Sequence, residues 1–150
     1  MALKEQLFVD LKEAMKSKDT TRKNTIQLIR AGILQIEKDN QTELDDEGVL
    51  DVIAKELKKR RDALPDFEKA NRPDLIGETN KEMEVLLGYL PKQLSEDEVK
   101  QIIQETITET EASSPKDMGK VMKALTPKIK GRADNKKAGE LVKKLLAEKN

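Results

Sequence analysis

The stretch that divides this chain is YLPKQLSEDEV, residues 89–99. Pro91 disfavours continuation of a helix, because proline has no backbone amide hydrogen to donate and its ring clashes with the preceding turn. Ser95 and Glu98 then have the spacing of a capping box, in which each side chain accepts from the other residue's amide. The stretch therefore ends one helix and starts another. It predicts an N-terminal helical domain over residues 1–92 and a small helical domain over residues 93–150.

Before this boundary, apolar residues recur at helical spacing and predict a helical bundle. We expect Asp45 or Asp46 to cap one helix, and Pro65 to end or kink it. Residues 66–75 are then expected to form a short helix with a bend at Pro73. The successive apolar stripes are Leu3, Leu7, Leu11, Ala14 and Met15, with Phe8 beside them; Ile26, Ile29, Ile33 and Ile36; Val49, Ile53, Leu57 and Leu64; and Met83, Leu86, Leu87 and Leu90.

After the boundary, three short stripes predict three helices. Ser114 and Pro115 suit the start of the second helix, and Asp134 can cap the third. Gly131 suits a left-handed turn between them. No strand pattern stands out, so the sequence predicts an all-α fold. The three stripes are Val99, Ile102, Ile103 and Thr106; Met118, Val121, Met122 and Leu125, which Ile129 can extend; and Ala138, Leu141, Val142 and Leu145.

The composition excludes several kinds of chemistry. The chain has no cysteine and no histidine, so disulfides, Cys-His or Ser-His dyads and histidine-containing metal sites are excluded. Carboxylates are plentiful, but their spacing marks out no catalytic pair. We therefore predict no catalytic residue, no metal and no cofactor. The N-terminus is charged within four residues and no long apolar run follows, which predicts a soluble cytoplasmic protein without a membrane span.

The zero net charge hides a strong asymmetry. Residues 113–150 hold eleven Lys and Arg against four Asp and Glu, which leaves this tail at +7 and residues 1–112 at −7. Such a split favours a polyanion as partner of the tail. Attraction between the two parts of the chain would explain it equally well.

The basic side chains of the tail are the main candidate site. They are Lys116, Lys120, Lys123, Lys128, Lys130, Arg132, Lys136 and Lys137. One interpretation is a solvated face opposite the apolar stripe, and the other is a phosphate-binding surface. The tail has no aromatic residue, whereas single strands are usually held by stacking on aromatic side chains. If the tail binds nucleic acid, a folded RNA such as tRNA is the better candidate.

Two further features have simpler interpretations. Lys58-Lys59-Arg60-Arg61 is interpreted as a solvated face, although Arg60 or Arg61 can pair with an acidic neighbour. Gly119 stands within a helical stripe, where glycine costs up to about 1 kcal/mol relative to alanine. Close packing of two helices is the interpretation that we favour for this glycine, with Met118 and Met122 in the core.

The stretch SSPKDMGKVMKALTPKIKGRADNKKAGELVKKLL, residues 113–146, resembles the tail of the GatB/YqeY family. The whole chain, including LKKRRDALPDFEKANRPDL at residues 57–75, resembles a stand-alone YqeY-type protein. The tail matches the end of the B subunit of aspartyl/glutamyl-tRNA amidotransferase, which engages the outer corner of tRNA. The resemblance thus implies an N-terminal helical domain followed by a smaller helical domain that contacts tRNA. This chain departs from the family pattern at Ala138 and Gly139.

The resemblance implies no catalysis by this chain. In the amidotransferase, kinase and transamidation chemistry belong to a separate domain, and glutamine hydrolysis belongs to another subunit. A carbon–nitrogen ligase activity with glutamine as amido donor would therefore need other subunits. We expect a non-catalytic tRNA-associated module, with a possible protein partner at the N-terminal domain. The alternative is a protein-interaction module with no RNA role, and an enzyme ranks third.

Overall fold

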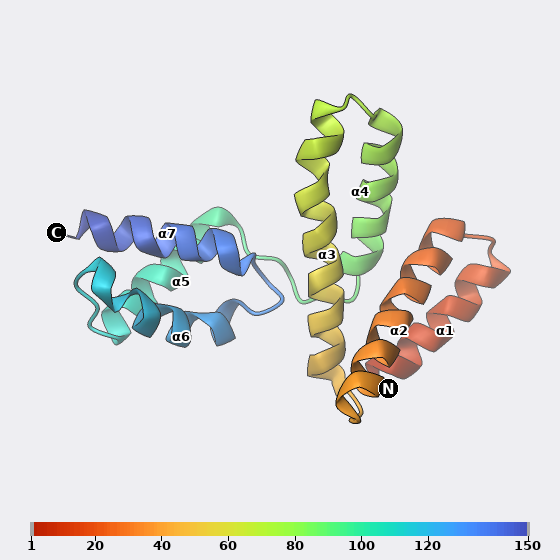
Figure 1. The fold of residues 1–150 in the computed structure, drawn as a ribbon, viewed down its shortest axis with the longest axis horizontal. Coiled ribbons are helices and arrows are strands. Elements are labelled where there is room, and N and C mark those ends of the chain that lie inside the picture. The colour runs from red at the N-terminus through yellow and green to blue at the C-terminus, as the bar shows by residue number, and fades with distance from the viewer. Residues whose placement is uncertain (1, 150) are drawn as a thin grey trace. The chain divides into compact units, whose positions relative to one another are not determined.

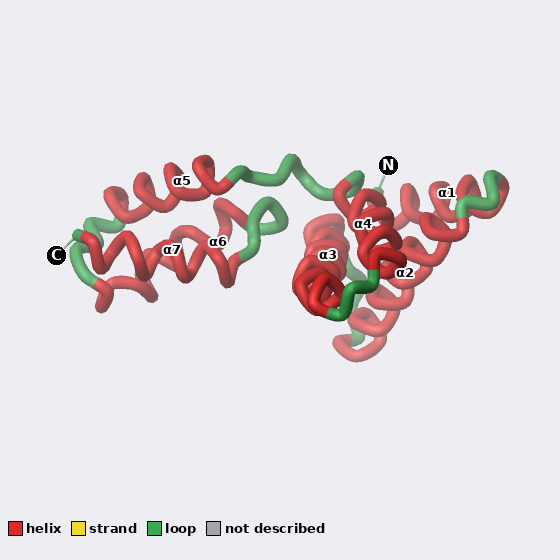
Figure 2. Tube along the Cα trace, turned by 90° about the horizontal axis from the view of Figure 1, so that it is seen from above, coloured by secondary structure: helices red, strands yellow, loops and turns green. Residues whose placement is uncertain are grey.

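The computed structural model describes residues 2–149, and within that range it contains helices and no strand. The predicted all-α fold is therefore confirmed (Figures 1 and 2). In chain order the elements are α1 (Leu3–Lys16), α2 (Thr20–Asn40), α3 (Asp46–Lys69), α4 (Pro73–Leu87), α5 (Glu96–Glu109), the 3-10 turn η1 (Pro115–Asp117), α6 (Met118–Ile129) and α7 (Asn135–Glu148).

The chain forms two compact units, residues 1–90 (unit 1) and residues 91–150 (unit 2). Unit 1 is built from two helical hairpins, α1 with α2 and α3 with α4 (Figure 1). Contacts of α2 with α3 and α4 join the hairpins around one core. That core consists of Leu7, Leu11, Ile26, Ile29, Ile33, Val49, Val52, Ile53, Leu57, Leu86 and Leu90.

Short polar side chains start several of the helices. Asp45 accepts a hydrogen bond from the Gly48 amide at 2.8 Å, which confirms the predicted cap of α3. Ser95 and Glu98 form the expected capping box at the start of α5. Each such cap satisfies an amide that has no partner within its helix, and its removal typically costs about 1 kcal/mol.

The sequence predicts that Pro65 ends or kinks its helix, and as the end of the helix this position is wrong. α3 continues through Pro65 to Lys69. Pro65 is exposed, so water can satisfy the carbonyl that its missing amide leaves unpaired. The helix ends instead near Asn71, which has a left-handed φ of 53°. Pro73 opens α4, a position that suits proline because its amide would be unpaired there.

A polar cluster around the buried Asp10 ties α1 to Tyr89, two residues after the end of α4. Asp10 is 7% exposed and accepts hydrogen bonds from the Tyr89 hydroxyl at 2.5 Å and the Gln6 amide at 2.8 Å. An Arg22 nitrogen lies 3.5 Å from the same carboxylate. Burial, and then the bond to Asp10, raise the pKa of the Tyr89 hydroxyl above its usual value. The cluster thus favours a neutral tyrosine that keeps donating to the buried carboxylate.

Unit 2 is a three-helix arrangement of α5, α6 and α7, in which each helix contacts the other two. Its core side chains are Val99, Ile103, Ile107, Ala112, Val121, Leu125, Ile129, Ala138, Val142 and Leu146. This core leaves the basic residues of α6 and α7 exposed, with the exception of the half-buried Lys128. Across residues 2–149, no helix is long and apolar enough to cross a lipid bilayer.

Candidate nucleic-acid interface

The start of the basic helical hairpin is held by Asp117. Its carboxylate accepts from the amides of Ser113 at 2.8 Å and Ser114 at 3.4 Å. The hydrogen bond from Ser113, helped by Ser114 and by the charge of Lys120, keeps the pKa of Asp117 below its usual value. Because α6 follows η1 directly, Lys116 lies about one turn before Lys120.

The turn between α6 and α7 is hydrogen-bonded to residues 92–94, which precede α5. Gly131 has a φ of 73°, which confirms the predicted left-handed turn. The Leu94 amide donates to the Arg132 carbonyl at 2.9 Å, and the Gln93 side chain donates to the Gly131 carbonyl at 2.8 Å. Nε of Arg132 donates to the Lys92 carbonyl at 3.4 Å. The structure thus places Arg132, half-buried, against its own chain rather than on an open surface.

Lys128 is also engaged inside unit 2. Its ammonium group donates to Glu109 at 2.7 Å and to the buried Thr106 hydroxyl at 3.0 Å. α5 carries five acidic residues and one lysine, so the acidic and basic parts of the sequence meet here within one unit. Lys128 therefore fits the second explanation of the charge asymmetry, in which the basic tail is attracted to the acidic part of the same chain.

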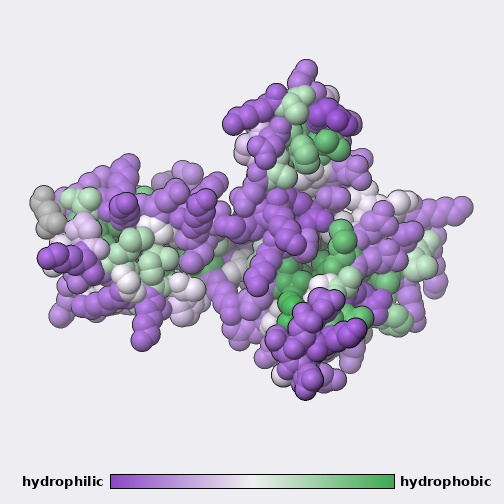
Figure 3. Space-filling model, in the orientation of Figure 1, coloured by the Kyte–Doolittle hydropathy of each residue, from purple (hydrophilic) through white to green (hydrophobic). Residues whose placement is uncertain are grey.

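The other six candidates are exposed: Lys116, Lys120, Lys123, Lys130, Lys136 and Lys137. Within residues 2–149, Lys120, Lys123 and Lys136 have no carboxylate within ion-pair distance. Lys143 and Lys144 on α7 are exposed too, although they lie outside the eight candidates. Hydrophilic side chains cover much of unit 2 in the view of Figure 3. The structure thus separates the exposed lysines from Lys128 and Arg132, which are half-buried and bonded within unit 2.

Gly119 lies among these lysines, and the packing interpretation of this glycine is wrong. Gly119 is exposed, and a Cβ built on it would meet no atom within 4 Å. The glycine that is packed is Gly139, where a Cβ would lie 3.8 Å from the terminal methyl groups of both Met118 and Met122. Those distances are ordinary van der Waals contacts, so the departure from the family pattern at Gly139 lies in the packed interface with α6 without being required by it. We call Gly119 with Lys116, Lys120 and Lys123 the Gly119 face.

Exposed lysines also stand at the start of α7, which packs against α6. The Thr126 hydroxyl lies 3.4 Å from the Asn135 side chain, and Met122 lies over Gly139, so α6 and α7 run antiparallel. Lys123 precedes Thr126 by three residues and shares its side of α6. Lys136 follows Asn135 directly at the start of α7. Exposed lysines of both helices therefore lie within a few residues of the positions where α6 contacts α7.

In the basic run of unit 1, Arg60 has a structural role. Arg60 donates to Glu56 at 2.7 Å and to Glu82 at 3.0 Å, and its side chain is only 12% exposed. This pairing confirms that Arg60 bonds to acidic neighbours and links α3 to α4. Burial opposes ionisation of Glu56, but hydrogen bonds from Arg60 and Lys59 outweigh it and lower the pKa of that carboxyl. Among residues 2–149, no group of three or more acidic side chains is arranged to hold a metal ion.

Comparison with curated proteins finds relatives in fungi. A protein of Lachancea thermotolerans called "Altered inheritance of mitochondria protein 41, mitochondrial" is 37% identical over 110 residues, which cover 71% of this chain and 58% of the relative. The protein of the same name from Pyrenophora tritici-repentis is 32% identical over 134 residues, covering 85% and 71%. The one from Kluyveromyces lactis is 36% identical over 110 residues, covering 71% and 59%. The alignment thus spans about three fifths of the Lachancea and Kluyveromyces proteins.

These names contradict the cytoplasmic location expected from the sequence, because each of the three relatives is called mitochondrial. A charged, cysteine-free composition without an apolar span indicates only an aqueous surrounding, and an aqueous compartment of an organelle meets that condition as well as the cytosol. The names describe no catalytic activity. The model of one family, described as "Yqey-like protein", matches residues 4–146, nearly the whole chain, so this protein belongs to the Yqey-like family.

Proposed function

We propose that unit 2 binds the phosphate backbone of a folded RNA, with tRNA as the leading candidate, through the Gly119 face. In this proposal the protein is a non-catalytic RNA-associated module. The observation that carries it is an exposed, unpacked glycine within a group of exposed lysines. A glycine there makes the helix less stable than alanine would, and nothing within unit 2 needs the space that it leaves.

The chemistry of the face suits phosphate groups. Lysine binds phosphate as a point charge through a flexible stem, so its contacts are salt-dependent and carry little sequence information. A glycine in the same face lets a phosphate or ribose approach the helix backbone without meeting a Cβ. The acidic side chains of α5 would repel the same ligand, so we expect RNA to approach from the α6–α7 side.

The resemblance to the amidotransferase tail supports this proposal, because that tail engages tRNA. The names of the relatives make a mitochondrial tRNA the first RNA to test. The second candidate function is a protein-interaction module, and an exposed apolar groove in unit 1 favours it. The two functions use different units and do not exclude one another.

The test is equilibrium binding of labelled tRNA to the purified chain at low ionic strength. A triple variant, Lys120→Gln, Lys123→Gln and Lys136→Gln, removes three exposed charges from the proposed surface. A control variant, Lys55→Gln, Lys69→Gln and Lys81→Gln, removes three exposed charges from unit 1. We expect the first variant to lose most of its affinity and the control to retain it. Equal losses in both variants would show a nonspecific charge effect, and no binding by the unmodified chain would refute the RNA proposal.

A further inference from the structure

Unit 1 exposes apolar side chains on its first hairpin. The most exposed large hydrophobic residues within residues 2–149 all lie on α1 and α2: Phe8 (43%), Val9 (38%), Met15 (57%), Leu28 (51%) and Leu34 (66%). Phe8 and Met15 are seven residues apart and therefore share one face of α1. Isolated exposed apolar residues are ordinary, so a contact surface is indicated only where such a residue lines a groove, as Leu34 does.

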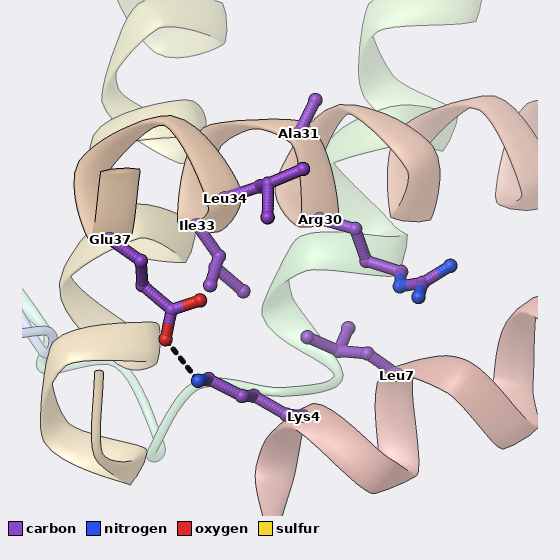
Figure 4. Close-up of a pocket in the computed structure, with 7 residues that line it drawn as sticks. All are labelled: Lys4, Leu7, Arg30, Ala31, Ile33, Leu34 and Glu37. Carbon is purple, nitrogen blue, oxygen red and sulfur yellow. Dashed lines mark hydrogen bonds and ion pairs between the residues drawn. The ribbon is translucent and has the colours of Figure 1, made fainter. Parts of the chain in front are cut away.

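A groove lies between these two helices (Figure 4). It encloses about 330 Å³, with the buried Leu7 and Ile33 at its base and the exposed Leu34 on the α2 side. Lys4 of α1 forms an ion pair with Glu37 of α2, as the dashed line in Figure 4 shows. The groove is thus apolar at its base and bordered by charged groups, as sites for amphipathic helices are.

Arg30, which lines this groove, and Lys12 of α1 both lie against the Phe8 ring. The Lys12 ammonium group is 4.3 Å from the centre of the Phe8 ring, and the Arg30 guanidinium is 5.0 Å from it. Cation–π attraction holds both charges next to the exposed ring. Within residues 2–149, neither cation has a carboxylate within ion-pair distance. The border of the groove therefore offers two positive charges to an acidic ligand.

We propose that this groove docks an amphipathic helix of another protein. An aliphatic side chain of that helix fills the space over Leu7 and Ile33 against Leu34. Asp or Glu side chains one turn away pair with Lys12 and Arg30. The proposal rests on the apolar base of the groove and on charge complementarity at its border, and it is independent of RNA binding by unit 2.

Other occupants fit less well. A symmetric pair of this chain centred on Phe8 would bring Lys12 and Arg30 of both copies together, and like charges at an interface cost several kcal/mol. An anionic membrane would meet the exposed Glu5 and Glu13 on the same helix, and a concave seat inserts poorly into lipid. A nucleic-acid base would have to displace the two cations from the Phe8 ring before stacking on it.

The test is selection of helical peptides from a displayed random library on the full-length chain. We expect recovered peptides to carry aliphatic residues spaced by three or four positions, with Asp or Glu beside them. Leu34→Glu should weaken their binding about tenfold or more, the size of a central contact. Leu28→Glu is the matched control, because Leu28 is exposed on the same helix but does not line the groove. Reversing the border with Lys12→Glu and Arg30→Glu should shift the preference to peptides with Lys or Arg.

The other outcomes are equally informative. Recovery of no binder, of basic binders, or of binders insensitive to Leu34→Glu would overturn the proposal. Concentration-dependent dimerisation that Leu34→Glu abolishes would assign the groove to a second copy. Binding to vesicles containing anionic lipid that the same variant abolishes would assign it to a membrane. Loss of labelled tRNA binding in Leu34→Glu would place RNA there instead. Circular dichroism of each variant shows whether the helices are intact.

Discussion

Replacing Gly119 with alanine should stabilise the protein and weaken RNA binding. Alanine is the better helix former by about 0.5–1 kcal/mol, and the added methyl group meets no atom within 4 Å. For a unit of this size, a gain of that order raises the midpoint of thermal unfolding by roughly 2–8 °C. Overfilling a close contact costs about 1–3 kcal/mol, which corresponds to a roughly 5- to 150-fold loss of tRNA affinity.

Gly77→Ala is a closely matched control. Gly77 and Gly119 each stand four residues after a proline that opens a helical segment, and neither has an atom within 4 Å of a built Cβ. Gly77 lies on α4 of unit 1, outside the proposed RNA surface. We therefore expect Gly77→Ala to stabilise unit 1 by a similar amount without changing tRNA affinity.

Two measurements on the same three proteins decide the matter. Calorimetry gives the unfolding midpoints, and fluorescence anisotropy gives the tRNA dissociation constants. If Gly119→Ala destabilises unit 2, then the open space around this glycine is misjudged. If it stabilises the unit and leaves tRNA affinity at the value of the unmodified chain, then no ligand approaches the backbone there.

Three further predictions concern stability and organisation. Tyr89→Phe removes a hydrogen-bond donor to the buried Asp10 carboxylate, so it should lower the free energy of unfolding by about 1–3 kcal/mol, measured by urea titration. No change beyond experimental error would show that this hydrogen bond does not stabilise unit 1. The Ser95 amide donates to the Glu98 carboxylate and the Ser113 amide donates to the Asp117 carboxylate, so folding lowers the pKa of both carboxyls. The stability that these bonds contribute is therefore present above about pH 4 and is lost as the pH falls below it. A free energy of unfolding that stays constant down to pH 2 would contradict this prediction. We propose that the two units are separable domains, and we expect trypsin to cut the native chain first after the exposed Lys92, whereas a first cut within α6 would argue against that division.

The helices were largely predictable because their signals are local. The capping pair Ser95–Glu98 and the turn glycine Gly131 act within a few residues, and the structure shows both as expected. Pro65 misled the prediction because the cost of a proline depends on where the unpaired carbonyl points, which the sequence does not state. The Asp10–Tyr89 bond joins residues 79 positions apart, and no local pattern announces it.

The candidate site was predictable in outline only. Charge counting located the basic hairpin, but it could not separate Lys128 and Arg132, which bond to unit 2 itself, from the exposed lysines. Those pairings depend on how α5 and the segment before it pack. For Gly119 a usable signal did exist, because its position on a helical wheel lies well away from the Val121–Leu125 stripe and beside Lys123. Packing explains neither Gly119 nor the equally open Gly77, and what sets Gly119 apart is the group of exposed lysines around it.

The most direct test of the account is the salt dependence of tRNA binding. For a polyanion held by lysines, the logarithm of affinity falls linearly with the logarithm of salt concentration, with a slope of about 0.7–0.9 per phosphate contact. We predict that Lys120→Gln, Lys123→Gln and Lys136→Gln together reduce this slope by roughly 2–3, since three contacts are lost. The control variant Lys55→Gln, Lys69→Gln and Lys81→Gln should keep the slope of the unmodified chain. A slope that is the same in all three proteins would contradict the account, because RNA would then bind elsewhere than the Gly119 face.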